Sequence, residues 1–332
     1  MSVDAPVDAP VDGPVDGPVD VLVVGGGPAG ALAAAALVQA GREVAIVDPL
    51  GVGGRLLNVE HLHHRDGQSR GMLGWDRASE LAEQVLGVGV ELIFGQADTV
   101  TFDPADSTWR VSVDGQPQRA RAVLVATGCR PEPVPGDEQG QLHGHGVSYC
   151  AVCDAGLFRG QPVAVIGGGP IAMAEAASLV PMASEVIVLV PTDHPTAPPT
   201  LVDALRRTGK VTWRMAAPVL SVGTTGAAGS PTLTVRHTAL DGQTITSLHV
   251  GGVFGAHRDL PNSALLHGVA ALDDDGFVIT DDTLGCVGVP GLFAAGDVRA
   301  GGHADLAAAE ADGKQAAASI DAYLRSAPRR SG

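Results

Sequence analysis

The sequence has few aromatic residues and few basic ones. Aromatic side chains make up 3% of the 332 residues, and 21 Lys and Arg stand against 37 Asp and Glu, a formal net charge of −16 at pH 7. Nucleic acids and anionic membranes attract basic surfaces and repel acidic ones. The composition therefore argues against DNA, RNA and the membrane as partners, and it favours α/β layers packed from Ala, Gly and Val.

Long apolar runs and a secretion signal are also missing. No uncharged apolar run approaches the roughly 18 residues of a transmembrane helix, and the N-terminus lacks the basic region and apolar block of a signal peptide. The chain has only four cysteines. We expect a cytoplasmic protein, in which closely spaced cysteines are more often catalytic or metal-binding than structural.

Residues 1–18 repeat a Val-Asp-x-Pro tetrapeptide, so that proline recurs at every fourth position. Proline lacks a backbone N–H group, and the repeat has no apolar face to bury. We predict a disordered, acidic tail.

Glycine, by contrast, is abundant, with 45 residues. The stretch "VDVLVVGGGPAGALAAAALVQAGREVAIVD" is typical of a strand, a turn, a helix and a second strand. Gly25, Gly27 and Gly30 fit the pattern G-x-G-x-x-G, which allows a tight turn, close backbone approach to a pyrophosphate, and packing of helix on strand. The phosphates would lie at the N-terminus of the helix. Asp48 ends the second strand, where it would accept a hydrogen bond from a ribose 2′-hydroxyl.

The same pattern returns 142 residues later, in "PVAVIGGGPIAMAEAASLVPMASEVIVLVP". Gly167 and Gly169 repeat the first two glycines, and Ala172 replaces the third, which this position tolerates. Val190 stands where the first copy has Asp48, so the second copy lacks an acid for the ribose. Asp193 would suit NADH there and would repel the 2′-phosphate of NADPH.

These patterns predict an α/β protein with two Rossmann-like, doubly wound nucleotide-binding domains, the second inserted into the first. We expect the first domain to comprise residues 19–131 and 251–332, and the second, which carries the paired cysteines, to comprise 132–250. Prolines at 131–135 mark the first crossing between domains, and "GGVFG" near Gly251 marks the second.

Two cysteines stand close together in "SYCAVCDAG". A zinc site needs four ligands, but Cys129 and Cys286 are isolated in the sequence, with no second CxxC or closely spaced histidine pair beside them. The cluster of His61, His63 and His64 is not a recognisable ligand set by itself. A disulfide across so short a loop constrains the unfolded chain little and exchanges readily. We therefore predict that Cys150 and Cys153 form a redox pair and that the chain holds no metal.

Taken together, these segments resemble the low-molecular-weight thioredoxin reductases. The resemblance covers nearly everything after residue 19 and is carried by "GGGPAG", "ATG", "GVSYCAVCD" followed by "VAVIGGGP", and "GLFAAGDV". It implies FAD in the first domain, with Asp297 on the ribityl chain and the Val298 amide near the flavin ring, and it implies a homodimer. The residues assigned to FAD are Gly25, Gly27, Pro28, Ala29, Gly30, Asp48, Gly54, Arg55, Thr127, Gly128, Gly296, Asp297 and Val298.

The chain also departs from that family. The family's His-Arg-Arg stretch, which holds the NADPH phosphate, falls on Pro191-Thr192-Asp193, and the segment after the family's Gly-Gly-Gln-Leu is here "GGRLLNVEHLHHRDG". In these features the chain resembles the flavin-dependent dithiol oxidases that act on gliotoxin- or holomycin-type natural products. It differs from them at Asp154, where those oxidases often have His. We favour oxidation of a small-molecule dithiol with O2 as acceptor. The alternative is a reductase of thioredoxin or another protein, fed by NADH, NADPH or ferredoxin.

The resemblance also implies that the two cysteines have different roles. Cys150 would be the exposed sulfur that exchanges with substrate, and Cys153 would face the flavin. Asp154 would carry the proton for the departing thiolate, unless it only caps a turn. His303 would assist deprotonation if it lies near the flavin, and is otherwise an ordinary surface or core histidine.

Overall fold

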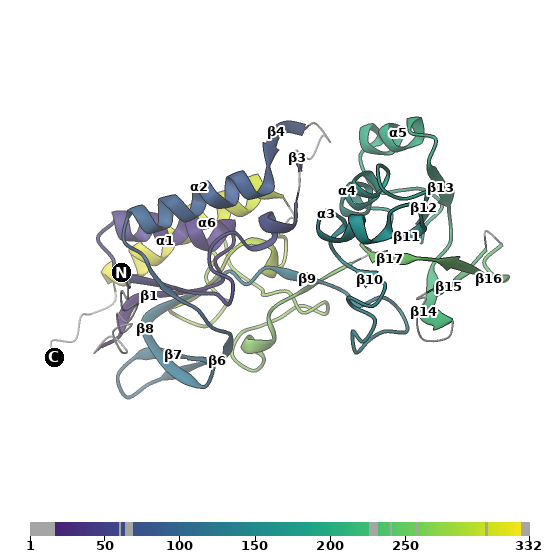
Figure 1. The fold of residues 1–332 in the computed structure, drawn as a ribbon. Coiled ribbons are helices and arrows are strands. Elements are labelled where there is room, and N and C mark those ends of the chain that lie inside the picture. Colours follow the sequence, from purple (N-terminus) through teal and green to yellow (C-terminus); the bar gives the residue numbers. More distant parts are fainter. Residues whose placement is uncertain are drawn as a thin grey trace, which may run out of the picture.

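The computed structural model describes residues 17–59, 61–63, 69–225, 232–239, 241–256, 258–302 and 305–326. It has two lobes joined by a short antiparallel pair of strands, β9 (Cys129–Pro131) and β18 (Asp259–Pro261) (Figure 1). The predicted tail lies almost entirely outside the described residues, as does His303.

A seven-stranded sheet forms the centre of the first lobe, in the order β5-β2-β1-β8-β7-β6, with β19 pairing along the second half of β8. The strands are β1 (Val19–Val24), β2 (Val44–Val47), β5 (Glu91–Ile93), β6 (Ala97–Asp103), β7 (Thr108–Val113), β8 (Gln116–Val125) and β19 (Leu292–Ala294). Strands β5, β2, β1, β8 and β19 are mutually parallel, so their carboxyl ends share one edge. Ligands of open α/β sheets bind at that edge.

Three helices cover one face of this sheet (Figure 1): α1 (Pro28–Gln39), α2 (Gly74–Gly87) and α6 (Leu306–Ser326). Helix α1 is built largely of alanine and is buried on almost every side, because α6 and the sheet both pack closely against it. Short elements complete the lobe. They are η1 (Gly54–Asn58), β3 (His61–His63), β4 (Ser69–Leu73), η3 (Ala264–Leu266) and η4 (Gly296–Val298).

The second lobe contains a parallel five-stranded sheet in the order β10-β17-β11-β12-β13, beside a three-stranded antiparallel sheet, β14-β15-β16. The strands are β10 (Val147–Ser148), β11 (Pro162–Ile166), β12 (Glu185–Leu189), β13 (Val211–Arg214), β14 (Val219–Thr225), β15 (Thr232–Thr238), β16 (Ile245–Val250) and β17 (Gly252–Gly255). Its helices are α3 (Ala151–Asp154), η2 (Ala155–Phe158), α4 (Pro170–Leu179) and α5 (Pro199–Arg207). The fold is therefore α/β with two Rossmann-like units, as the sequence predicts.

The pairing of β17 changes where the chain is expected to return from the second domain to the first. The sequence places residues 251–332 in the first domain, but β17 pairs in parallel with β11 and β10 of the second sheet. Its residues are all buried there, because "GVFG" supplies the apolar run of a central parallel strand. We therefore propose that the second domain runs from 132 to about Gly255, with the return crossing at β18.

Candidate active site

The first glycine-rich turn joins β1 to α1, and its glycines serve different purposes. Gly25 has φ +108°, and a Cβ on it would lie 2.4 Å from the carbonyl oxygen of Ala126; a Cβ on Gly30 would lie 2.0 Å from the carbonyl oxygen of Gly25. Both glycines are thus required by packing. A Cβ on Gly27 would meet nothing within 4 Å. The fold does not require glycine at Gly27, so the open space above it fits close approach by a ligand.

Other predicted cofactor residues gather around this turn. Pro28 and Ala29 begin α1, and a Cβ on Gly296 would lie 3.1 Å from the Cβ of Ala29. Gly54, with φ +55°, lies so close that its Cβ would be 3.0 Å from the Cα of Gly27. The "GGGPAG", "GGR" and "AAGD" segments therefore meet at one place.

Asp48 is held by backbone amides. Its Oδ2 accepts a hydrogen bond from the Gly26 N–H at 2.8 Å, and its Oδ1 accepts from Leu50 and Gly51 at 2.8 and 3.0 Å. These bonds tie the loop after β2 to the glycine-rich turn. The predicted contact between Asp48 and a ribose hydroxyl stays a prediction.

Thr127 and Gly128 form the turn after β8, and an unpredicted residue fixes them. Asn262 donates through Nδ2 to the Thr127 carbonyl at 3.0 Å, the Thr127 hydroxyl donates to the Asn262 carbonyl at 2.8 Å, and the Asn262 N–H donates to the Gly128 carbonyl at 2.9 Å. Asn262 lies 134 positions after Gly128, so local spacing in the sequence gives no sign of it.

Asp297, in η4, has a buried carboxylate oxygen that could accept a hydrogen bond from a ligand. Its Oδ1 has no hydrogen-bond partner among the residues that the structure describes. Burial is the main cause that raises the pKa of Asp297 to about 6; Arg55 lowers it, while Asp259 and Asp312 also raise it. A buried unpaired carboxylate oxygen is costly. A ribityl hydroxyl donating to Oδ1 would satisfy it, so the residues present fit FAD.

A buried ion pair holds η4 in place and was not predicted. Arg299 donates to both carboxylate oxygens of Asp312, from Nε at 2.5 Å and from Nη2 at 2.7 Å, and the Gly296 N–H donates to Asp312 at 2.9 Å. Val298, predicted to lie near the flavin ring, is buried. Arg55 donates to Asp259 at 2.7 Å, and both interact electrostatically with Asp297. Two fixed cation–carboxylate pairs thus border the proposed cofactor site.

Cys150 and Cys153 form a disulfide at the start of α3, with their Cα atoms 5.4 Å apart. Cys153 is exposed and Cys150 is half-buried. Cys150 precedes the helix, and the Cys153 N–H donates to its sulfur at 3.2 Å. These exposures are those of the whole residues, so the expectation that Cys150 exchanges with substrate while Cys153 faces the flavin stays a prediction.

Asp154 is adjacent to the pair and holds a second side chain. Its Oδ2 accepts from the Ser148 hydroxyl at 2.7 Å, and the same hydroxyl oxygen accepts from the Cys150 N–H at 3.1 Å. Ser148 was not predicted. The Asp154 carboxylate is therefore connected through Ser148 to the backbone of Cys150, and its predicted role in proton transfer stays a prediction.

A second carboxylate, from α4, bonds to the backbone next to the disulfide. Glu175 accepts a hydrogen bond from the N–H of Ala151, the residue directly after Cys150. Burial is the main cause that raises the pKa of Glu175 to about 7; Asp154 also raises it, while the Ala151 N–H and Arg55 lower it. Glu175 was not predicted from the sequence, because only the packing of α4 on α3 brings it near the cysteines.

The second glycine-rich turn is covered by the loop after β12. The Gly168 carbonyl accepts from the N–H groups of Thr196 and Ala197 at 2.8 and 3.0 Å, and a Cβ on Gly168 would lie 2.8 Å from a methyl group of Val190. Asp193 is exposed and paired with His194. Val190, which stands where the first copy has Asp48, therefore lies against the second turn.

The remaining cysteines are buried thiols, Cys129 and Cys286, and burial raises the pKa of each to about 12. Both therefore stay protonated and unreactive at neutral pH. Within the described parts of the chain, no three His, Cys, Asp or Glu side chains are placed to hold a metal ion. Nor is any described helix long and apolar enough to cross a membrane.

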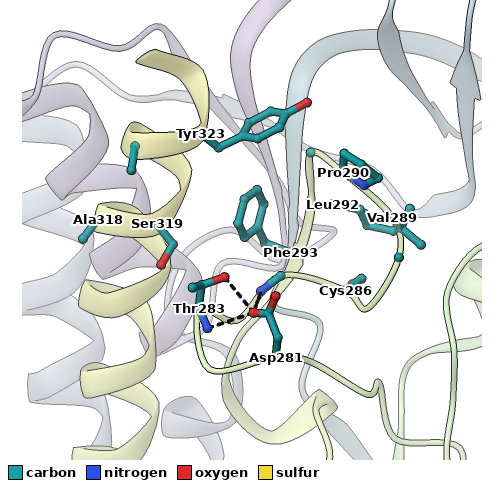
Figure 2. A pocket seen from close by; sticks show the side chains of 14 residues that line it. Asp281, Thr283, Cys286, Val289, Pro290, Leu292, Phe293, Ala318, Ser319 and Tyr323 are labelled. Atoms are coloured by element: carbon teal, nitrogen blue, oxygen red, sulfur yellow. Dashed lines mark hydrogen bonds between the residues drawn. The ribbon is translucent and has the colours of Figure 1, made fainter. Parts of the chain in front are cut away.

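A cavity of about 570 Å³ lies between α6 and the segment leading into β19 (Figure 2). Figure 2 shows Tyr323 and Ser319 on α6 facing Phe293, with Asp281 hydrogen-bonded to Thr283 at the rim. The cavity is at the start of β19, whereas Asp297 and the glycine-rich turn are at the carboxyl ends of the strands. None of the predicted site residues lines it.

The chain is similar in sequence to known oxidoreductases. Residues 19–313 match the model of the pyridine nucleotide-disulphide oxidoreductases. The chain is 33% identical over 307 residues to a thioredoxin reductase of Mycolicibacterium smegmatis, covering 91% of this chain and 94% of that protein. It is 34% identical over 282 residues to a bifunctional thioredoxin reductase/thioredoxin of Mycobacterium leprae, covering 84% of this chain but only 60% of that longer protein.

Two solved structures share the fold of this chain. The thioredoxin reductase of Lactococcus lactis, in its FR conformation, aligns with a TM-score of 0.83 at 26% identity over 92% of this chain and 99% of that one. The thioredoxin reductase of T. acidophilum aligns with a TM-score of 0.83 at 25% identity, over 93% and 99%.

Proposed function

Because the chain belongs to the pyridine nucleotide-disulphide oxidoreductase family and is an FAD-dependent disulfide oxidoreductase of the thioredoxin reductase type, we propose that it reduces a disulfide in a thioredoxin-like protein. The observation that carries this proposal is the exposed Cys150–Cys153 disulfide with apolar surroundings. Val152 and Leu157, which flank Cys153, are 42% and 73% exposed. Exposed apolar side chains beside a reactive group suit contact with a protein partner.

Bound FAD, once reduced by the electron donor, would supply two electrons to the disulfide. The residues proposed to hold it are the glycine-rich turn at Gly27, the Thr127-Gly128 turn and Asp297. Arg55 would place a positive charge beside Asp297, and its own pairing with Asp259 keeps it oriented. The chain's contribution is to bind and orient the cofactor at the strand edge, since binding and orientation are what the protein supplies in a flavoenzyme.

The reduced cysteine pair would then reduce the partner by thiol–disulfide exchange. We propose that the accessible Cys153 attacks the partner's disulfide as a thiolate, forming a mixed disulfide and releasing one partner thiol. Cys150 then attacks Cys153, which re-forms the Cys150–Cys153 disulfide and frees the second partner thiol. Asp154, linked to the backbone of Cys150 through Ser148, is proposed to accept and return the proton.

The electron donor is proposed to be a nicotinamide nucleotide bound at the second glycine-rich turn, with NADH preferred over NADPH. No arginine stands between Val190 and Arg206, and exposed Asp193 would repel a 2′-phosphate. Replacing Thr192 and Asp193 by arginine should improve the use of NADPH several-fold relative to NADH. Equal use of both nucleotides by the wild type would contradict this preference.

The second candidate is the oxidation of a small-molecule dithiol with O2 as acceptor, which the sequence analysis favours. The same missing arginines support it, because an oxidase needs no nicotinamide. The relatives found by comparison are thioredoxin reductases, which favours the reductase. The predicted homodimer stays a proposal that sedimentation velocity tests.

Steady-state assays separate the two candidates. The purified flavoprotein is mixed with NADH or NADPH and an oxidised thioredoxin, and the thiols formed are counted. In parallel, oxygen uptake is measured with small dithiols and no nucleotide. We expect nucleotide-dependent reduction of thioredoxin. Rapid oxygen uptake with a dithiol, without thioredoxin reduction by either nucleotide, would establish the oxidase instead.

A further inference from the structure

Glu175 contacts the backbone next to the redox pair from a different helix. Its side chain projects from α4 and accepts the N–H of Ala151, the residue between Cys150 and the exposed Val152. This N–H is in the first turn of α3 and has no partner within so short a helix. The contact therefore fixes the start of α3, and with it the backbone on which Cys150 is carried.

Three charged side chains set the surroundings of this carboxyl group. Asp154 acts on it from α3, and Arg55 acts from η1 of the other lobe. Arg55 is itself paired with Asp259 of β18 at 2.7 Å, which reduces the positive charge that Glu175 experiences. Burial and Asp154 favour the protonated acid, and the pKa near 7 follows from their dominance. A carboxyl group with a pKa near 7 gains or loses its proton in response to a small change in the charges around it.

We propose that Glu175 is a positioning residue for the Cys150–Cys153 pair and that its carboxyl group binds a proton when the disulfide is reduced and releases it when the disulfide re-forms. The inference rests on the redox activity proposed above, but on neither the donor nor the partner.

The charge balance of the reduction explains why Glu175 would bind a proton. Reduction breaks the S–S bond with two electrons, supplied by reduced FAD or by an external dithiol, and full neutralisation requires two protons. If one sulfur stays a thiolate, its negative charge beside Glu175 favours the protonated carboxyl group. One proton then resides on a sulfur and the other on Glu175. The remaining thiolate is thus available to attack without a full negative charge on Glu175 beside it.

Glutamine at this position separates a proton site from a simple structural contact. Glu175→Gln keeps an oxygen that can accept the Ala151 N–H but cannot gain or lose a proton near neutral pH. A purely structural contact would survive this change. Glu83→Gln, an exposed glutamate of α2, is the matched control.

The test is the pH profile of thiol reactivity in the reduced holoprotein. The protein is reduced with excess dithiothreitol, freed of reductant, and alkylated with iodoacetamide between about pH 5 and about pH 9, the range in which thiols and a raised carboxyl group titrate. In the wild type and Glu83→Gln the rate should rise in two steps, as expected of two coupled groups. In Glu175→Gln the profile should lose the step that belongs to Glu175, and between the two wild-type steps the rate should be up to about tenfold faster, the limit for a thiol pKa lower by about one unit.

A second measurement needs no variant. The infrared difference spectrum between the reduced and the disulfide form of the wild type should show a gain in protonated carboxyl absorption. A wild-type spectrum without this gain, or alkylation profiles of Glu175→Gln and wild type that coincide, would overturn the inference. Neither measurement uses thioredoxin or a nicotinamide nucleotide, so failure of the proposed reductase activity would be seen separately, in the steady-state assays.

Discussion

The two glycine-rich units of this chain share a backbone and differ in what surrounds it. In the first, the Gly25 N–H donates to the Val47 carbonyl at 2.8 Å and the Ala31 N–H donates to the Gly27 carbonyl at 2.9 Å. In the second, the equivalent bonds, 142 residues later, join Gly167 to Leu189 at 3.0 Å and Met173 to Gly169 at 3.2 Å. The motif therefore determines the turn in both units.

The difference lies in the side chains that the motif does not specify. The first unit has Asp48 at the end of its second strand and an unpaired Asp297 oxygen among the described residues around its turn. The second has Val190, and next to its turn it has the cysteine pair with two carboxylates, Asp154 and Glu175. We propose that the first unit retains the cofactor and that the second exchanges electrons with a partner that binds transiently.

The largest effect is expected from breaking the cysteine pair. Cys150→Ser and Cys153→Ser should each lower protein-disulfide reduction by about a hundredfold or more, because neither variant can cycle through a disulfide. Flavin content should not change. Mass spectrometry of the products with an oxidised partner also identifies the exchanging sulfur. We expect a stable mixed disulfide in Cys150→Ser, on Cys153; a mixed disulfide formed only in Cys153→Ser would return the role to Cys150.

The next effect concerns pH and stability in the second unit. The folded state raises the pKa of Glu175 from 4.5 to about 7, so its ionisation opposes folding. The cost is absent below the unfolded pKa, grows as the pH rises, and is complete above the folded pKa. Denaturation in urea should therefore show that Glu175→Gln gains stability relative to wild type between about pH 4.5 and about pH 8, by at most about 3 kcal/mol. A difference that does not vary with pH would contradict the raised pKa.

A smaller effect is expected from the first unit. Asp297→Ala should weaken FAD retention by about 1–3 kcal/mol, the value of a buried hydrogen bond to a carboxylate. Flavin released on dilution, measured by its fluorescence, gives the change in affinity. Asp282→Ala, an exposed carboxylate of a loop, is the control and should retain FAD as the wild type does. Unchanged retention in Asp297→Ala would remove Asp297 from the cofactor site.

The smallest effect compares the two turns directly. Alanine at Gly27 or at Gly169 causes no backbone clash, since a Cβ meets nothing within 4 Å at Gly27 and only the Thr196 hydroxyl at 3.7 Å at Gly169. Both variants should unfold within about 0.5 kcal/mol of the wild type. Gly27→Ala should weaken FAD by about tenfold, and Gly169→Ala should raise the KM for the nucleotide with flavin content unchanged. If Gly169→Ala alters no kinetic constant, the second turn binds no nucleotide.

Much of this arrangement follows from local patterns in the sequence. Gly25, Gly27 and Asp48 were predicted from spacing, and the repeat at an offset of 142 predicted the second unit, because each depends on residues within one strand-turn-helix segment. Residues that act across the fold were not predicted. Asn262 and Glu175 are such residues, since each reaches its site only through tertiary packing.

The exposures of the two cysteines and the place of β17 show the same limit. A two-residue spacing does not say which sulfur faces solvent, because that depends on how α3 packs against α4. A short apolar run such as "GVFG" does not say which of two parallel sheets will take it. In both cases tertiary contacts decide between alternatives that the local sequence leaves equal.

The central claim is that electrons pass from a nicotinamide nucleotide through FAD and the Cys150–Cys153 pair to a protein disulfide. Flavin absorbance under anaerobic conditions tests it most directly. NADH should bleach the flavin, and oxidised thioredoxin should then restore its colour in the wild type but not in Cys150→Ser or Cys153→Ser. If instead no nucleotide bleaches the flavin, a small dithiol does, and only oxygen restores the colour, the protein is a dithiol oxidase and the account is wrong.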